Sequence, residues 1–256
     1  NASLVRFKPQ YFVSSVQGEL SGHVKTQGIW SEKLKRIDIR DLNAAGFLNN
    51  KPIRGRGNLS LLLDSNQKGF LPQQFEANNL FFAYAQNQLQ ATGNAQSLKI
   101  KLNAPALYEL YPGLQGRAYG SLNVQSQPRL KATANIAVDN FAFNELASIR
   151  SLRIQGELPT SEATPTLLIA KVDHLRSGNR EIEDATINLG GTRKAHVLKV
   201  ESNNRQSNFY VQLAGGFNQN NDWLGQLQKG HFKSRRIDLV QNQSAPIIYS
   251  TAQSEL

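Results

Sequence analysis

The sequence predicts an all-β fold that is elongated and mostly antiparallel. Apolar and polar residues alternate with a period of two through most of the chain, which is typical of strands with one dry face and one wet face. Turn signals separate these segments by about 10 to 15 residues, a spacing that suits antiparallel hairpins and is too short for helical crossovers between parallel strands. A long internal repeat indicates stacked units, and therefore an elongated body.

The expected strands can be followed along the chain by their apolar positions. The segment 98–102 is the plainest case, because Leu98, Ile100 and Leu102 alternate with two lysines. The same spacing joins Leu59, Leu61 and Leu63; Leu122 and Val124; Ala134, Ile136 and Val138; Ile187 and Leu189; Leu198 and Val200; and Phe209, Val211 and Leu213. Turns are expected at residues 65–69, 86–88, 177–179, 190–191 and 218–222.

The repeat is recognised by its glycines. Gly18-x-x-x-Gly22 recurs as Gly116-x-x-x-Gly120, and similar strands follow at residues 37–42 and 136–141. These glycines mark bulges or let neighbouring backbone come close, or they are ordinary turn glycines. We expect one elongated β-repeat segment over residues 1–256, with repeat-like units at about 10–110 and 108–240. Because the chain starts at Asn1 without an initiator Met or a signal-like segment, we expect it to be a piece of a longer protein.

One segment departs from the strand pattern. Between Ala104 and Leu114 the apolar residues recur at steps of three and four, and Pro112-Gly113 ends the pattern. This predicts a short helical element near residues 105–111. Residues 11–16 carry apolar side chains at comparable positions of the first repeat, so we expect a similar short element there.

Composition narrows the function classes. Hydrophobic residues are 39% of the chain, below the usual ~45–50%, which suits sheets with one wet face. Cysteine is absent, which excludes disulfides, thiolate nucleophiles and sulfur-ligated metals. The net charge of +10 favours some attraction to phosphates of nucleic acid or of a membrane surface. The cations form only short clusters at residues 33–36, 54–56 and 233–236, which are more often solvated strand faces. No apolar run approaches the ~20 residues of a membrane span.

The sequence contains no recognisable catalytic or metal-binding pattern. His23, His174, His196 and His231 lie far apart, and none has a second ligand at metal-site spacing. His196 shares the parity of Leu198 and Val200, so we expect a satisfied histidine on the dry side. The acidic run 181–184 is expected to be a wet strand start. The sequence therefore predicts no catalytic residue, no metal site, no cofactor and no enzyme activity.

Nucleic-acid binding is not expected either. Single-strand binders interleave cations with aromatic stacking positions. Phe81, Phe82 and Tyr84 have no Lys or Arg nearby in the sequence, and Arg117 beside Tyr119 is isolated. Only the overall charge supports this interpretation.

Several motifs, in their order and spacing, resemble the TamB family of AsmA-like proteins. They are Gln86-Asn87-Gln88-Leu89 followed by Gly93, Leu98-Lys99-Ile100, Leu107-x-x-Leu110-x-Pro112-Gly113-Leu114-x-Gly116, Pro128-x-Leu130-x-Ala132, Gly191-Thr192-x-x-x-His196-x-Leu198 and Trp223-x-Gly225-x-Leu227. The resemblance covers about residues 80–239, and it reaches the first 79 residues only through the repeat.

This resemblance implies a β-taco, a long sheet folded into a U-shaped trough with an apolar lining. It also implies residence in the periplasm of a double-membraned bacterium and transport of phospholipids between the inner and outer membranes, in support of outer-membrane protein assembly. The family further implies an inner-membrane helix outside this segment. Its partner is the outer-membrane barrel TamA, which it contacts through parts of the protein that are absent here.

We therefore expect a lipid-binding groove lined by the alternating apolar residues. Its candidate residues are Leu98, Ile100, Leu102, Leu122, Val124, Ala134, Ile136, Val138, Ile187, Leu189, Leu198, Val200, Phe209, Val211 and Leu213. Alternation shows a dry face without showing what covers it. A closed sandwich, a structural or adhesive β-solenoid and a polyanion-binding β domain with a closed core remain alternatives.

Overall fold

The structure is a computed structural model and describes residues 2–11, 17–31, 34–64, 74–94, 96–125, 131–158, 163–178, 180–204, 207–218 and 222–250. Strands make up 79% of it and helix 3%, which confirms the predicted all-β class. By contacts the chain divides into two compact units, residues 1–131 and 132–256. The predicted repeat-like units follow motif spacing instead, and that division stays a prediction. Phe12, Val13, Val16, the turn at 65–69, Pro128 and Leu130 lie outside the described residues.

Unit 1 is an antiparallel meander in which each strand pairs with the next along the chain. Its strands are β1 (Ala2–Phe7), β2 (Gly18–Trp30), β3 (Leu34–Leu48), β4 (Lys51–Asp64), β5 (Gln74–Tyr84), β6 (Asn87–Gly93), β7 (Ser97–Ala104) and β8 (Leu114–Gln125). Two short 3₁₀ turns, η1 (Pro9–Tyr11) and η2 (Leu107–Glu109), precede β2 and β8. The helical element predicted near 105–111 is confirmed by η2.

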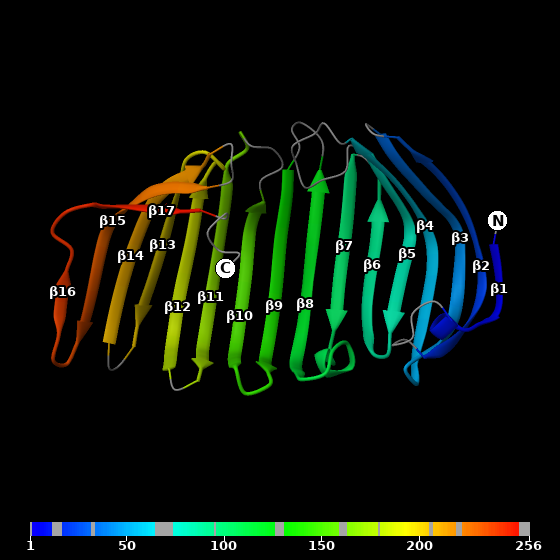
Figure 1. Cartoon of the computed structure of the whole chain (residues 1–256), viewed down its shortest axis with the longest axis horizontal. Helices are drawn as coiled ribbons and strands as arrows, with labels where there is room; N and C mark the ends of the chain where they lie inside the picture. Colours follow the sequence, from blue (N-terminus) through cyan, green and yellow to red (C-terminus); the bar gives the residue numbers. More distant parts are fainter. Residues whose placement is uncertain are drawn as a thin grey trace. The chain divides into compact units, whose positions relative to one another are not determined.

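Unit 2 repeats this plan with strands that lie side by side (Figure 1). They are β9 (Lys131–Phe143), β10 (Ala147–Leu158), β11 (Thr166–Ser177), β12 (Arg180–Gly191), β13 (His196–Asn203), β14 (Ser207–Phe217), β15 (Trp223–Ser234), β16 (Asp238–Val240) and β17 (Ala245–Tyr249). From β9 to β15 each strand pairs antiparallel with the next strand, and β16 and β17 both pair with β15. Each unit is thus a run of antiparallel strands, consistent with the expected β-taco.

The glycines of the first repeat copy permit close packing of backbones. A Cβ on Gly18 would lie 2.1 Å from the carbonyl oxygen of Phe47, and one on Gly22 would lie 2.2 Å from that of Asn43. No side chain fits at these distances. Both positions therefore bear out the close-approach interpretation, and neither is a turn glycine, because both lie within β2.

Left-handed residues interrupt the alternation at corresponding places of the two repeats. Asp41 in β3 and Asn140 in β9 both have positive φ, of 49° and 50°. Asp and Asn tolerate this conformation better than most residues. The apolar positions change parity there, from Ile39 to Leu42 in β3 and from Val138 to Phe141 in β9, while the apolar side stays the same. These kinks keep one face apolar along a strand that bends.

Few large side chains are buried. Among the described residues, the buried apolar set consists of alanines together with Leu107 and Val124. Leu107 belongs to η2, whose backbone is held by the buried side chain of Asn87. That amide accepts a hydrogen bond from the Ala106 N–H at 3.2 Å and donates one to the Ala106 carbonyl at 2.9 Å. Hence the best-packed core of unit 1 lies beneath this turn, at one end of β6 to β8.

Candidate functional site

The apolar residues of unit 2 form continuous rows across its strands. Partners in an antiparallel pair project to the same face of the sheet. One row, the leucine row, consists of Leu168, Leu189, Leu198, Leu213 and Leu227, which are successive partners from β11 to β15. A second row, the isoleucine–valine row, consists of Ile136, Ile154, Ala170, Ile187, Val200 and Val211, from β9 to β14.

All ten predicted residues of unit 2 lie on this apolar face. Seven belong to the two rows. Ala134 joins the leucine row through Gly156, which pairs with Leu168. Val138 pairs with Leu152, and Phe209 precedes Val211 by two positions on β14. The alternate positions carry mostly polar side chains, so the sheet has one apolar side and one polar side, as the alternation predicts.

The five predicted residues of unit 1 also share one face. Leu98 pairs with Val124, and Ile100 pairs with Leu122, between β7 and β8. Leu102 pairs with Leu89 on β6, and Leu89 pairs with Phe82 on β5. The apolar face of unit 1 therefore continues onto β5 and β6.

In the described part of the chain, most side chains of these faces keep part of their surface exposed, so no second layer seals them within their own units. Of the fifteen predicted residues only Val124 and Ala134 are buried, Leu102 is 37% exposed, and the others are half-buried. In a filled sandwich the inner faces of two sheets interdigitate and side chains such as Leu198 or Ile187 are buried. Large connected apolar surfaces of this kind mark sites that bind apolar ligands or partners. The half-buried state of the rows is the central property of the candidate site.

Sequence reasoning missed the middle of the unit 2 face. Leu152 and Ile154 on β10, and Leu168 and Val172 on β11, connect the predicted residues of β9 with those of β12. Their period-two spacing is visible in the sequence. On β11, however, the run Leu167-Leu168-Ile169 hides the parity, and only the register shows that Leu168 belongs to the leucine row.

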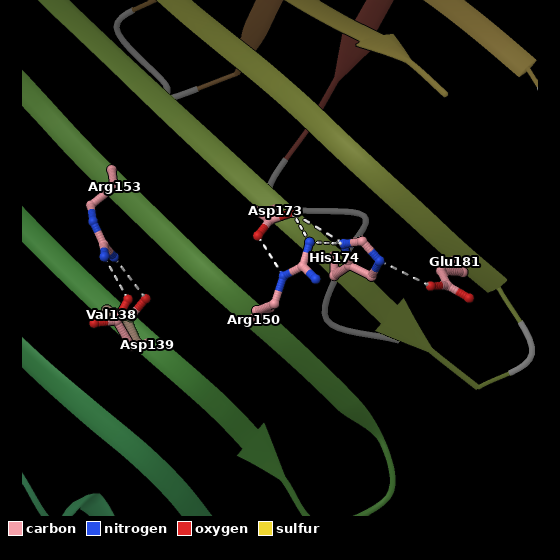
Figure 2. A network of polar contacts seen from close by, with 7 residues as sticks. All are labelled: Val138, Asp139, Arg150, Arg153, Asp173, His174 and Glu181. Atoms are coloured by element: carbon pink, nitrogen blue, oxygen red, sulfur yellow. Dashed lines mark hydrogen bonds and ion pairs between the residues drawn. The ribbon is translucent and has the colours of Figure 1, made fainter. Parts of the chain in front are cut away.

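A polar network crosses the polar side of unit 2 at the level of the kink (Figure 2). Arg150 on β10 holds both carboxylate oxygens of Asp173 on β11, at 2.6 Å each. The backbone of His174 has a φ of +48°, and the ring of this residue lies between Asp173 and Glu181. Arg153 pairs with Asp139 at 2.6 Å. These contacts tie β9 to β12 together where the strands bend, on the side opposite the rows.

Acid should weaken this network. The Arg150 guanidinium, followed by His174, holds the pKa of Asp173 well below its usual range. Because the folded-state pKa is depressed, the stabilisation is complete above the ordinary value of about 3.9 and is lost as the pH falls toward the lower folded value. We expect Asp173→Asn to lower the thermal midpoint at pH 7, and we expect its difference from the wild type to shrink below about pH 4. The control is Glu145→Gln, which removes a carboxylate from the exposed hairpin after β9. A difference in thermal midpoint between Asp173→Asn and the wild type that does not change with pH would contradict the prediction.

His196 confirms the expectation of a satisfied histidine on the apolar side. Its Nε2 accepts a hydrogen bond from the Trp223 indole N–H at 2.8 Å, and its Nδ1 lies 3.1 Å from the Thr192 carbonyl oxygen. The indole N–H can only donate a hydrogen bond and the carbonyl oxygen can only accept one. The His196 ring therefore carries its hydrogen on Nδ1. The Trp223 indole covers Gly215 and Gly225, whose added Cβ atoms would lie 2.6 and 2.4 Å from it. The motif at 191–198 thus meets the motif at 223–227.

The other histidines do not form a site. His174 belongs to the polar network, and His231 contacts Asp238 at 2.8 Å. Within the described ranges, no group of three His, Cys, Asp or Glu residues is placed to hold a metal ion. The same part of the chain contains no helix that is long and apolar enough to cross a bilayer.

Comparison with known proteins agrees with these converging motifs. The sequence profile of the family described as TamB, N-terminal domain, matches residues 1–256. The chain belongs to the TamB family. A curated TamB relative, the translocation and assembly module subunit TamB of Haemophilus influenzae, is 23% identical over 262 residues. This alignment covers 99% of the chain and 19% of that TamB protein, so the chain spans about a fifth of its relative's length. No solved structure gives a significant match.

Proposed function

We propose that the apolar faces of this chain hold the acyl chains of phospholipids and let them move from strand to strand. The observation that carries the proposal is the half-buried leucine row, which presents the same side chain on five successive strands. Transfer of a phospholipid with about thirty methylenes into water costs roughly 25 kcal/mol of free energy, at ~0.8 kcal/mol per exposed methylene. An uninterrupted apolar surface removes most of this barrier.

Uniform lining favours movement over storage. A deep pocket would bind a lipid tightly at one place, whereas equal contacts at each strand keep its free energy nearly constant over the ~4.8 Å between neighbouring strands. The leucine and isoleucine–valine rows run perpendicular to the strands, in the direction in which strands are added. The head group remains in water at the open side. Cations near it would add a modest attraction for anionic head groups, which salt weakens.

Family membership extends the proposal to the longer protein. We propose that the chain is a segment of a bridge that is anchored in the inner membrane and crosses the periplasm. In this proposal the bridge carries phospholipid to the outer membrane and supports outer-membrane protein assembly directly or indirectly. Contact with the TamA barrel is assigned to parts of the protein outside this chain. The TamB profile over residues 1–256 and the relative's name as a translocation and assembly module subunit support this part.

Photocrosslinking tests the proposal directly. A photoreactive amino acid at Ile136, and separately at Ile100, should capture phospholipid in cells, because both side chains lie on the apolar faces. The matched controls are Asn135 and Lys99, the preceding residues, which project to the polar side of the same strands. Mass spectrometry of the adducts identifies the lipid. Absence of lipid at both Ile100 and Ile136, or equal capture at the controls, would remove the support for a conduit.

A closed structural solenoid is the competing function. It predicts that the rows are buried against other side chains and that the purified chain releases no lipid in organic solvent. The half-buried rows favour the open face over this alternative.

A further inference from the structure

The polar side of unit 1 carries four exposed cations over β4 to β7. Arg54 and Arg56 on β4 and Lys99 and Lys101 on β7 are all exposed. Register places them on one side of the sheet. A single row of cross-strand partners consists of Arg56, Phe81, Gln90, Lys101 and Ser121. We call the surface that carries these four cations the cationic face. It lies opposite the apolar face of the same strands.

Among the described residues, no carboxylate neutralises the four cations of this face, although Arg56 packs over the Phe81 ring. Other cations of the chain are paired with carboxylates, as in Lys25 with Asp41, Arg36 with Asp38 and Arg153 with Asp139. Within the described part of the chain, Arg54, Arg56, Lys99 and Lys101 make no ion pair. Their charges therefore remain available to an anionic partner.

The side chains between the cations are hydrogen-bonding groups. A second row links Arg54, Ala83, Gln88, Asn103 and Tyr119, and Lys99 lies between Thr92 and Asn123. None of these three rows contains a carboxylate. Amides and hydroxyls both donate and accept hydrogen bonds, as the hydroxyl groups of a sugar do. Arg and Lys complement carboxylates or phosphates.

The dimensions and packing of the face favour an extended ligand. Lys99 and Lys101 are two residues apart on one strand, about 6.8 Å, and Arg56 and Lys101 are three strand spacings apart, about 14 Å. The Arg56 guanidinium lies 5.1 Å from the centre of the half-buried Phe81 ring, so this aromatic ring is covered and does not offer an open platform for base stacking. On β4 to β8, no large apolar side chain among the described residues is exposed on this side, whereas a face that inserts into a membrane needs one.

We propose that the cationic face binds an anionic glycan strand, with the cations on its acidic groups and the amides and hydroxyls on its sugar hydroxyls. This site is separate from the proposed lipid site, because the two lie on opposite sides of the same strands. A chain that carries lipid on one face is thereby held to an extended polysaccharide by the other.

The test measures binding of the purified chain to polygalacturonate, a carboxylated polysaccharide, by calorimetry at low and at physiological salt. The double variant Lys99→Gln/Lys101→Gln should bind about tenfold more weakly, the combined loss of two exposed charge contacts. Lys171→Gln/Lys199→Gln is the matched control, because it removes two exposed lysines from the polar side of unit 2 and changes the net charge equally. It should bind within twofold of the wild type. Circular dichroism should show that both variants are folded, as expected for exposed side chains.

Three outcomes would overturn the proposal. The first is equal weakening by the two double variants, which would indicate attraction by net charge alone. The second is binding to neutral dextran as strong as to polygalacturonate. The third is tighter binding, dependent on Lys99 and Lys101, to vesicles with anionic lipid or to single-stranded DNA, which would assign the face to another class of partner. Lipid that copurifies with the chain is measured in parallel and should not change in Lys99→Gln/Lys101→Gln, so the two proposals can fail independently.

Discussion

Replacing Ile136 with Asp should abolish lipid carriage while the chain still folds. Ile136 belongs to the isoleucine–valine row and lies on β9, opposite Ile154 on β10. Its side chain is only half-buried, so a carboxylate there reaches water when no lipid is present. When acyl chains cover the row, the carboxylate is placed in hydrocarbon at a cost of about 2.5–3.5 kcal/mol, which corresponds to a decrease in occupancy of roughly 100-fold. The measurement is phospholipid per protein chain after purification, together with transport by the longer protein that carries the substitution.

The neighbouring residue provides the control for this change. Asn135→Asp adds the same charge one position earlier, on the polar side of β9, and should leave bound lipid and transport unchanged. Circular dichroism reports whether the sheet is intact. Unfolding of the Ile136→Asp chain would indicate a sealed core in place of an open face, and equal loss of transport in both variants would show that the side of the strand is irrelevant.

The second large effect is expected at Gly215, beneath the Trp223 indole. A Cβ at this position would lie 2.5 Å from the Leu224 carbonyl oxygen, 2.6 Å from the indole and 2.7 Å from the Gly225 Cα. Two of these three atoms belong to the backbone, so relief requires β14 and β15 to separate and the indole to leave His196. We expect Gly215→Ala to lower the free energy of unfolding by about 1–3 kcal/mol, the usual cost of overpacking.

Gly190 is the matched control for Gly215. It lies in β12 of the same unit, and an added Cβ there meets no atom within 4 Å. Gly190→Ala should therefore be neutral or stabilising by about 0.4–1 kcal/mol, because alanine restricts the unfolded chain. Urea unfolding of both variants measures the difference, and tryptophan fluorescence reports the displacement of the indole. Similar stabilities for the two variants would show that the indole contact does not constrain the sheet.

Residues of motifs that are distant in the sequence meet in the fold. Asn87 and Leu107 are parts of separate sequence motifs, yet the Asn87 side chain holds the backbone of the turn that positions Leu107. His196 and Trp223 are also separate in sequence and share a hydrogen bond. In both cases a polar side chain fixes a local structure that the strands alone do not specify. These residues hold the fold, whereas the apolar rows are the surface to which we assign the proposed function.

The sequence by itself determined the antiparallel all-β class and, for the strands with plain alternation, the side that is apolar. Alternation is a local property, since successive side chains of a strand point to opposite faces whatever the partner strand is. For this reason Leu98, Ile100 and Leu102 could be assigned to one face without a structure. The short element near Leu107 was also predictable, because its changed spacing and the Pro112-Gly113 stop lie within a few residues.

Only the tertiary structure decided how these faces join. Register is set by pairing between strands, so the leucine row, and the place of Leu168 in it, cannot be derived from any single segment. The kinks at Asp41 and Asn140 change the parity of each strand, and local sequence does not reveal which Asp or Asn adopts positive φ. Register also brings Arg56 over Phe81, although no cation lies near Phe81 in the sequence. The burial of a side chain depends on what covers its face of the sheet. The sequence pattern of apolar residues is the same for a face that packs against another sheet and for a face that stays open.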